Sequence, residues 1–373
     1  MKIMHSTSGN KRQKTNRNHL LTSGMLAALL LAGCGQDSTN SASPVTTSEA
    51  ATTAPQQKEE GTDMKDNSNT AKGTTAGKLR AEDIPTALLS GQTSQLYAQM
   101  TNEFKKQVSE KDLQSSKSML QGIQSFKSLG DEIELNGELN GYIQYNWISD
   151  NNKLGLISIL EKDGQIAGMQ LQPIEQFPAT DNTLSKTTYR MPFDGEWYVF
   201  WGGTNVIQNY HYAVESQRYA YDLVQVKDGM SYSGDPEKNE SYYAFGQPVL
   251  APADGKVVSI VNNIADNEPV GEMNPRQPGG NMVVIDHGGE YSILGHLQKG
   301  SVTVKPGDSV QSGDPIGKVG NSGNSSEAHM HFQVSSGPDI MTDPSIRIHW
   351  VNDLDPVKGE TVDATNSKIV EPE

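Results

Sequence analysis

Cysteine and basic residues are scarce in this sequence, and each shortage argues against a class of protein. The chain has 373 residues and one cysteine, Cys34, which excludes an internal disulfide framework and a zinc finger with several thiolate ligands. Any metal site must therefore rely mainly on histidine and carboxylate ligands. The 30 Lys and Arg stand against 45 Asp and Glu, for a formal net charge of -15, and this balance argues against nucleic acid as a partner.

Hydrophobic residues are also below ordinary globular usage, at 34% of the chain, which predicts that part of the chain is unfolded. Residues 34–78 are rich in Ser, Thr, Ala, Gln and Asn and show no periodicity, so we predict a disordered linker there. Residues 353–373 have few large apolar side chains. We predict that they form a mobile acidic tail.

Acidic residues are absent from the first 33 positions, which carry five Lys or Arg together with the apolar run 25–32. This is the layout of a secretory signal peptide, and the run is shorter than the ~20 residues that a transmembrane helix needs. The leader ends in L-A-G-C, which resembles the lipobox of bacterial lipoproteins. The resemblance implies that residues 1–33 are removed and that Cys34 is lipidated, which would anchor the protein to the extracytoplasmic face of the cell membrane.

Histidine is absent from residues 79–175, where the apolar pattern changes from a helical period to a period of two. This change predicts helices followed by a small antiparallel sheet, and hence a small α+β domain to which we assign no catalytic role. From 188 to 352, short apolar runs alternate with turn signals and no long helical period appears, so we predict a mostly β domain. Six of the eight histidines lie in this second region.

Two of these histidines, His329 and His331, are two residues apart in a strand-like segment, so their side chains point to the same face. Such a pair can bind a metal or join a ligand to a base, although the H-x-H pattern alone is a weak signal. More specific motifs surround it. In chain order they are P-V-L-A-P-A-D-G-K-V-V (248–258), M-V-V-I-D-H-G (282–288), Y-S-I-L-G-H-L (291–297), G-D-P-I-G-K-V-G-N-S-G (313–323) and H-M-H-F (329–332).

The order of these motifs, across residues 197–336, resembles the lysostaphin-like murein metalloendopeptidases, also called LytM-type or glycyl-glycine endopeptidases. The resemblance implies an antiparallel β domain with a zinc site in an open groove. It also implies an enzyme that hydrolyses peptide bonds in the stems or cross-bridges of peptidoglycan. Carried over residue by residue, it makes Asp222 and His331 zinc ligands, and it makes His296 and His329 catalytic imidazoles.

The sequence departs from this family at the remaining ligand. The family places a histidine four residues before the aspartate, where this chain has Arg218. We predict that His211, the nearest upstream histidine, is the third protein ligand, because a loop of this length closes at a modest entropic cost. Glu215 is the alternative if the segment is helical. We expect His287 to be structural and His349 to pack at the surface.

Two imidazoles and one carboxylate would fill three of the four tetrahedral positions of Zn2+ and leave one for water, as in catalytic zinc sites. Zinc lowers the pKa of such a water towards ~7, so that a nucleophile is available at neutral pH. His329 could then move the water proton to the leaving amine, and His296 could stabilise the developing oxyanion. The sequence therefore predicts a membrane-anchored extracytoplasmic zinc metalloendopeptidase. The alternative is a catalytically degenerate cell-wall-binding or regulatory module on the same fold, because the short metal motif is broken.

Overall fold

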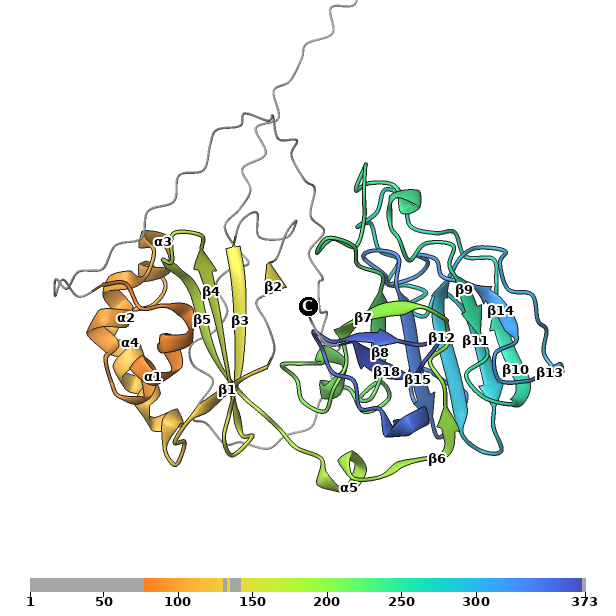
Figure 1. The fold of residues 1–373 in the computed structure, drawn as a ribbon, viewed down its shortest axis with the longest axis horizontal. Coiled ribbons are helices and arrows are strands. Elements are labelled where there is room, and N and C mark those ends of the chain that lie inside the picture. Colours follow the sequence, from red (N-terminus) through yellow and green to blue (C-terminus); the bar gives the residue numbers. More distant parts are fainter. Residues whose placement is uncertain (1–76, 130–132, 135–141, 371–373) are drawn as a thin grey trace, which may run out of the picture.

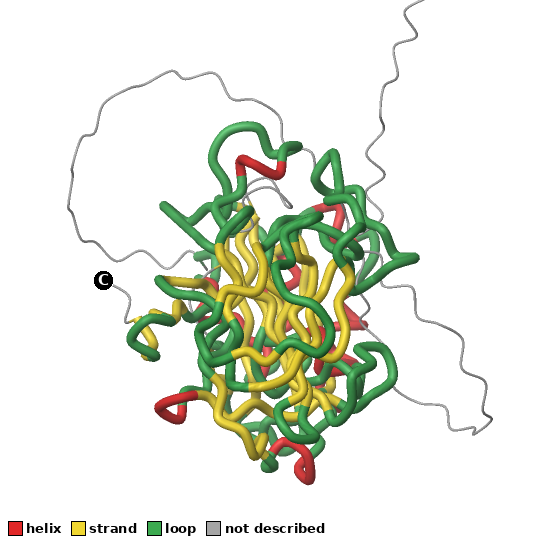
Figure 2. The backbone as a smooth tube through the Cα atoms, turned by 90° about the vertical axis from the view of Figure 1, so that its right-hand side faces the viewer, coloured by secondary structure: helices red, strands yellow, loops and turns green. Residues whose placement is uncertain are grey.

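Two regions lie side by side in the computed structural model, which describes residues 77–129, 133–134 and 142–370 (Figure 1). The predicted signal peptide, Cys34 and nearly all of the predicted linker lie outside the described residues. Each region has its own apolar core. Strands occupy the centre of the molecule, and short helices and loops lie at its periphery (Figure 2). None of the described helices is long and apolar enough to cross a membrane.

The first region consists of short helices packed against an antiparallel sheet (Figure 1). The helices turn Ile84 and Leu96 toward Leu156 of the sheet, and all three side chains are fully buried in one core. The strands pair in the order β1–β3–β4–β5, with β2 beside β3. The elements are α1 (Ile84–Leu89), α2 (Thr93–Gln99), α3 (Asn102–Lys105), α4 (Glu110–Ser115), β1 (Phe126–Ser128), β2 (Ile133–Glu134), β3 (Tyr142–Ser149), β4 (Leu154–Glu161) and β5 (Ile166–Pro173).

The second region is built almost entirely of antiparallel strands. Its main sheet runs in the order β13–β10–β11–β12–β15–β8–β7–β17–β18, and β9 and β14 form a small second sheet. The elements are β7 (Glu196–Trp201), β8 (Tyr221–Val224), β9 (Pro248–Leu250), β10 (Gly255–Val261), β11 (Asn281–Asp286), β12 (Tyr291–Leu297), β13 (Ser309–Val310), β14 (Pro315–Lys318), β15 (Met330–Ser335), β17 (Thr361–Asp363) and β18 (Lys368–Val370). The predicted fold class, a mostly β antiparallel domain after a small α+β domain, is confirmed.

A connecting segment, residues 174–183, joins the two regions and contains the single-turn helix α5 (Pro178–Asp181). The chain then enters β6 (Leu184–Tyr189), which pairs in parallel with β16 (Ser345–Trp350) at one end of the second region. Because β16 also pairs with the central strand β15, the connecting segment lies close to the middle of the main sheet.

The prediction of a mobile tail over residues 353–373 is wrong for the described part of that segment. Strand β17 pairs with β7, with Val362 opposite Trp197, and β18 pairs with β17 at the edge of the main sheet. Val362 is fully buried and Ala364 is 2% exposed. Main-chain hydrogen bonds to an existing strand hold this segment, so its few and small apolar side chains were too weak a signal of order.

Candidate metal centre

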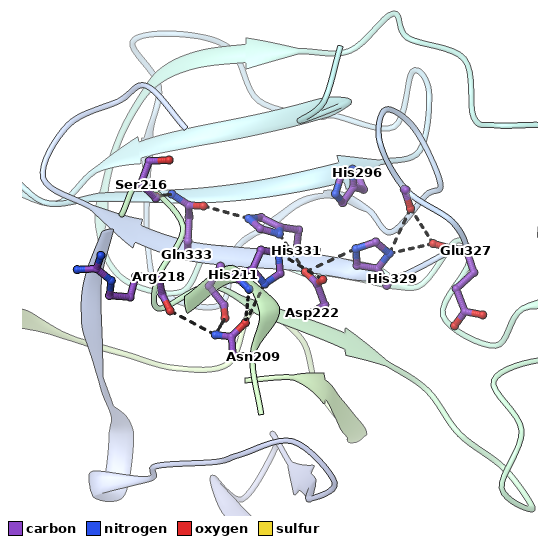
Figure 3. Close-up of polar contacts among 12 residues, drawn as sticks. Asn209, His211, Ser216, Arg218, Asp222, His296, Glu327, His329, His331 and Gln333 are labelled. Carbon is purple, nitrogen blue, oxygen red and sulfur yellow. Dashed lines mark hydrogen bonds and ion pairs between the residues drawn. The ribbon is translucent and has the colours of Figure 1, made fainter. Parts of the chain in front are cut away.

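Three side chains from distant parts of the sequence converge on one buried point (Figure 3). His211 comes from the 3-10 turn η3 (Tyr210–Ala213), Asp222 from β8 and His331 from β15. One possible ligand atom of each lies within 4.8 Å of those of the other two, and all three residues are buried. These are the three residues that the sequence analysis assigned to the metal.

Strand pairing positions two members of this cluster. Strands β8 and β15 are antiparallel neighbours whose register places Asp222 directly opposite His331. Side chains of opposed residues emerge on the same face of a sheet. The Asp222 Oδ1 atom therefore lies 2.9 Å from His331 Nδ1, and Asp222 Oδ2 lies 3.5 Å from His211 Nε2. The aspartate oxygens face one nitrogen of each imidazole.

The second nitrogen of His331 is held by an amide. His331 Nε2 lies 3.0 Å from Gln333 Oε1, and Gln333 Nε2 donates to the carbonyl of Ser216 and to the hydroxyl of Ser335. Because a carbonyl can only accept, the amide nitrogen must face Ser216 and the amide oxygen must face the imidazole. His331 Nε2 therefore donates to Gln333. His331 Nδ1 faces Asp222 Oδ1, and because a carboxylate only accepts, Nδ1 also carries a proton that a bound metal would displace.

A second amide fixes His211 in the same way. Asn209 Nδ2 donates to the carbonyls of Gly203, Arg218 and Ala220, which leaves Asn209 Oδ1 facing His211 Nδ1 at 2.9 Å. His211 Nδ1 therefore donates, and Nε2 presents its lone pair to the cluster. Outer partners of this kind orient the imidazole ligands of metal sites and set their tautomers.

The two histidines predicted to be catalytic border the cluster. His329 Nε2 lies 3.6 Å from Asp222 Oδ1, and its Nδ1 donates to the carbonyl of Glu327 over 2.9 Å. His296 Nδ1 donates to the carbonyl of Ser322 over 2.8 Å, and the His296 and His329 rings are 4.7 Å apart between centroids. His296 has a φ of +57°, an uncommon conformation for a residue other than glycine and one that is frequent at functional sites.

The electrostatics of the cluster come from burying one carboxylate among four imidazoles. Burial alone would raise the pKa of Asp222, but the neighbouring His211, His329 and His331 more than offset it and lower the pKa well below its usual range. Burial lowers the pKa of His211 to about 3 and that of His296 well below 6.5. Burial acts the same way on His331, yet the hydrogen bond to Asp222 raises its pKa overall. Neutral His211 and His296, and a His331 that favours its protonated form, therefore surround an ionised carboxylate.

Three further residues bear on the predicted site. Glu215, the alternative ligand, is exposed and lies outside the cluster. Arg218 is buried but turns away from the cluster (Figure 3). Cys34, the predicted lipidation site, lies outside the described residues.

The sequence analysis missed Asn209 and Gln333. Each is two residues from a predicted ligand, so the period of two on a strand could have indicated Gln333.

Residues 241–342 match the sequence profile described as Peptidase family M23. These residues are therefore similar to a peptidase family M23 domain. This result confirms the resemblance to the LytM-type peptidases. The matched range includes His296, His329 and His331, whereas His211 and Asp222 lie upstream of it. The cluster therefore combines His331 of the matched range with two residues of the preceding segment.

Two curated proteins are similar to this chain. The peptidoglycan DD-endopeptidase ShyA of Vibrio cholerae is 24% identical over 187 residues, which cover 50% of this chain and 36% of ShyA. An uncharacterized metalloprotease of Haemophilus influenzae is 34% identical over 89 residues, which cover 24% of this chain and 16% of that protein. The matches thus span about a third or less of each relative.

Among solved structures, the catalytic domain of the antimicrobial peptidase lysostaphin from Staphylococcus simulans is 20% identical. The match covers 46% of this chain and 95% of that chain, with a TM-score of 0.23. A similarity of this size carries no argument of its own.

Proposed function

We propose that this protein is a membrane-anchored extracytoplasmic zinc metalloendopeptidase that hydrolyses peptide bonds in the stems or cross-bridges of peptidoglycan. The observation that carries the proposal is the convergence of His211, Asp222 and His331, with His296 and His329 beside them. The M23 domain supports peptidase chemistry. The name of ShyA, a peptidoglycan DD-endopeptidase, supports the class of substrate.

The donor set fits zinc. His211 Nε2, a carboxylate oxygen of Asp222 and His331 Nδ1 would hold the ion, and two imidazoles with one carboxylate are the ligands of many catalytic zinc sites. The amides of Asn209 and Gln333 accept from the outer nitrogens of the two imidazoles and so direct His211 Nε2 and His331 Nδ1 toward the cluster, where zinc would displace the proton that His331 Nδ1 donates to Asp222. When bound, zinc would polarise the scissile carbonyl and lower the pKa of water toward neutrality.

The remaining two imidazoles would handle protons. His296 and His329 each donate Nδ1–H to a main-chain carbonyl, so each presents an unprotonated Nε2. That is the form of a general base. His329 Nε2 is near Asp222 and would take a proton from water and return it to the leaving amine. His296 would have to hold a proton at Nε2 before it could donate a hydrogen bond to the oxyanion.

The test of this function uses the full chain and two variants. Metal analysis of the purified protein should find about one zinc per chain, and digested peptidoglycan should show new amino termini. His331→Ala should lose both properties. His349→Gln is the matched control, because His349 lies in the same region but outside the cluster. Peptidoglycan binding without hydrolysis, unchanged in His331→Ala, would instead support a wall-binding module.

We also propose that lipid on Cys34 anchors the protein, because the leader ends in a sequence like the lipobox. Two or more acyl chains give stable membrane attachment. Mass spectrometry of the mature protein should find an acylated Cys34 at its amino terminus, and Cys34→Ser should be recovered without lipid. An unmodified Cys34 in the membrane-associated protein would overturn the anchor and leave the proposed hydrolysis unaffected.

A further inference from the structure

Of the three proposed ligands, His211 is the one that no strand holds. Asp222 and His331 are paired residues of adjacent strands, whereas His211 lies in a single 3-10 turn ten residues before β8. Ordering such a loop costs backbone conformational entropy. Asn209 orients the His211 imidazole, and further contacts must fix the loop that carries both residues if the cluster is to bind metal tightly.

We propose that the connecting segment between the two regions positions His211, and that Arg218 is the positioning residue that links them. The proposal rests on the proposed zinc site. Arg218 stands where the LytM-type pattern has a ligand, but its guanidinium Cζ lies 3.4 Å from the centroid of the Phe177 ring in the connecting segment. Its Nε donates to the carbonyl of Tyr212, the residue after His211.

Hydrogen bonds fasten the same loop to helix α5. The hydroxyl of Tyr212 donates to Asp181 Oδ2 over 2.8 Å, and the hydroxyl of Tyr219 donates to Asp181 Oδ1 over 2.8 Å. The Phe177 and Tyr212 rings also pack at 5.5 Å between centroids. The segment that separates His211 from Asp222 is therefore attached near both of its ends to residues 177–181.

The chain before His211 is held by the first region. Ile207 is buried in a small apolar cluster with Ile148 of β3 and Ile174 of the connecting segment. Ile207 also packs closely against Gly155 of β4, because a Cβ atom added to this glycine would lie 2.5 Å from Ile207 Cδ1. His211 thus sits between two contacts with the amino-terminal half of the protein, one on each side in sequence.

A planar guanidinium stacked on an aromatic ring explains why arginine occupies this position. The stack holds a buried cation against Phe177 while Nε still reaches the main chain of the ligand loop. Lysine would keep the charge and lose the planar stack and its donor geometry. The long loop between His211 and Asp222 is therefore held in place by its contact with the connecting segment.

The test measures zinc affinity of the full chain by competition with a chromogenic chelator. Phe177→Ala and Arg218→Ala should each raise the dissociation constant for zinc about tenfold, in the range found for outer partners of metal ligands. Phe177→Tyr keeps the ring and should bind like the unaltered chain. Phe245→Ala, at a half-buried phenylalanine outside the connecting segment and the cluster, is the matched control and should also bind normally.

Two further readouts separate positioning from general stability. The visible spectrum of the Co2+-substituted protein should change in Arg218→Ala and not in Phe245→Ala, because only the former disturbs a ligand. Arg218→Lys, expected between the unaltered chain and Arg218→Ala, gives the answer if Phe177→Ala does not fold. Equal zinc affinity in Arg218→Ala, Arg218→Lys and the unaltered chain would overturn the positioning role alone. No zinc binding by the unaltered chain would overturn this role together with the proposed function.

Discussion

The two regions of the molecule differ in what they bury. Among the described residues, the buried polar side chains of the first region are uncharged, namely Gln99, Thr101, Ser116, Ser149 and Ser158. The second region buries ionisable groups, including Asp222, His211, His296, His329 and His331. Burying such groups costs free energy unless they are paired. The first region therefore has the core of a purely structural domain. The second region pays a free-energy cost for burying ionisable groups, and a functional site explains that cost.

Burial alone does not mark the site, however. Glu290 is also buried, but its carboxylate accepts from the main-chain N–H groups of Lys186 and Thr187, which is a structural use. Lys358 is buried with its ammonium 3.4 Å from the centroid of the Trp201 ring. What distinguishes the cluster is that several imidazoles converge on one carboxylate. The two regions therefore differ in the convergence of side chains on one buried point, and not merely in the number of buried charges.

The largest expected effect is that of Asp222→Asn, which removes the charge from the cluster and keeps its shape. We expect zinc to be lost and peptide hydrolysis to fall by about 10³-fold or more, because metal activation supplies several kcal/mol. Metal analysis and the release of amino termini from peptidoglycan would measure this. Full hydrolysis in Asp222→Asn would remove the functional explanation for the buried charge.

A large cavity in the first core should lower stability and leave zinc binding unchanged, whereas Asp222→Asn should abolish zinc binding. Leu156 is fully buried in that core, so Leu156→Ala should lower the free energy of unfolding of the first region by about 2–5 kcal/mol. Zinc affinity should be unchanged, since Leu156 contacts neither the cluster nor the connecting segment in the described cores. Urea unfolding and zinc competition would check this. A coupled loss of zinc affinity would show that the two cores do not act separately.

Acid should destabilise the second region before the first, which has no histidine between residues 79 and 175. Burial lowers the pKa of His211 to about 3 and also lowers the pKa values of His287 and His296. In the unfolded chain all three would titrate near ~6.5, so their stabilising contribution is complete above that pH and is lost as the pH falls toward the folded values. His331 opposes this, because its raised pKa stabilises the fold in acid.

Three lowered pKa values against one raised value predict a net loss in the metal-free protein, of up to about 1.4 kcal/mol per pH unit for each unprotonated group. Urea unfolding at pH 7.5 and 5.5 with chelator would measure it for each region. His287→Gln should reduce the pH dependence of the second region. Equal acid sensitivity of both regions would contradict the explanation by buried histidines of the second region.

The smallest effect should come from His349→Gln. His349 Nε2 lies 3.1 Å from Asp353 Oδ1 at the surface, and exposed ion pairs contribute about 0–1 kcal/mol. Zinc content, hydrolysis and unfolding should all match those of the unaltered chain. A loss of zinc in this variant would mean that a histidine outside the cluster takes part in binding.

The sequence could predict those parts of the site that depend on local patterns. The spacing of His329 and His331 was a weak signal, and the resemblance to the LytM-type motifs was what placed these two histidines and Asp222 at one site. The fold class followed from the change of period and from the density of turns. The tail was mispredicted because pairing with β7 supplies main-chain hydrogen bonds that composition does not reveal.

Other parts of the site depend on contacts between distant residues, and no local pattern indicates them. The stack of Arg218 on Phe177 joins residues that lie on either side of β6 and β7, so the reason for the missing ligand at position 218 is visible only in the fold. Asn209 is similar, because its three carbonyl partners are brought together by the loop that it stabilises.

The most direct measurement is a crystal structure of the zinc-loaded protein with anomalous diffraction at the zinc edge. We predict one strong zinc peak at ~2.0–2.2 Å from His211 Nε2, a carboxylate oxygen of Asp222 and His331 Nδ1. A peak bound by other residues, or no peak at the cluster in the zinc-loaded protein, would contradict the account.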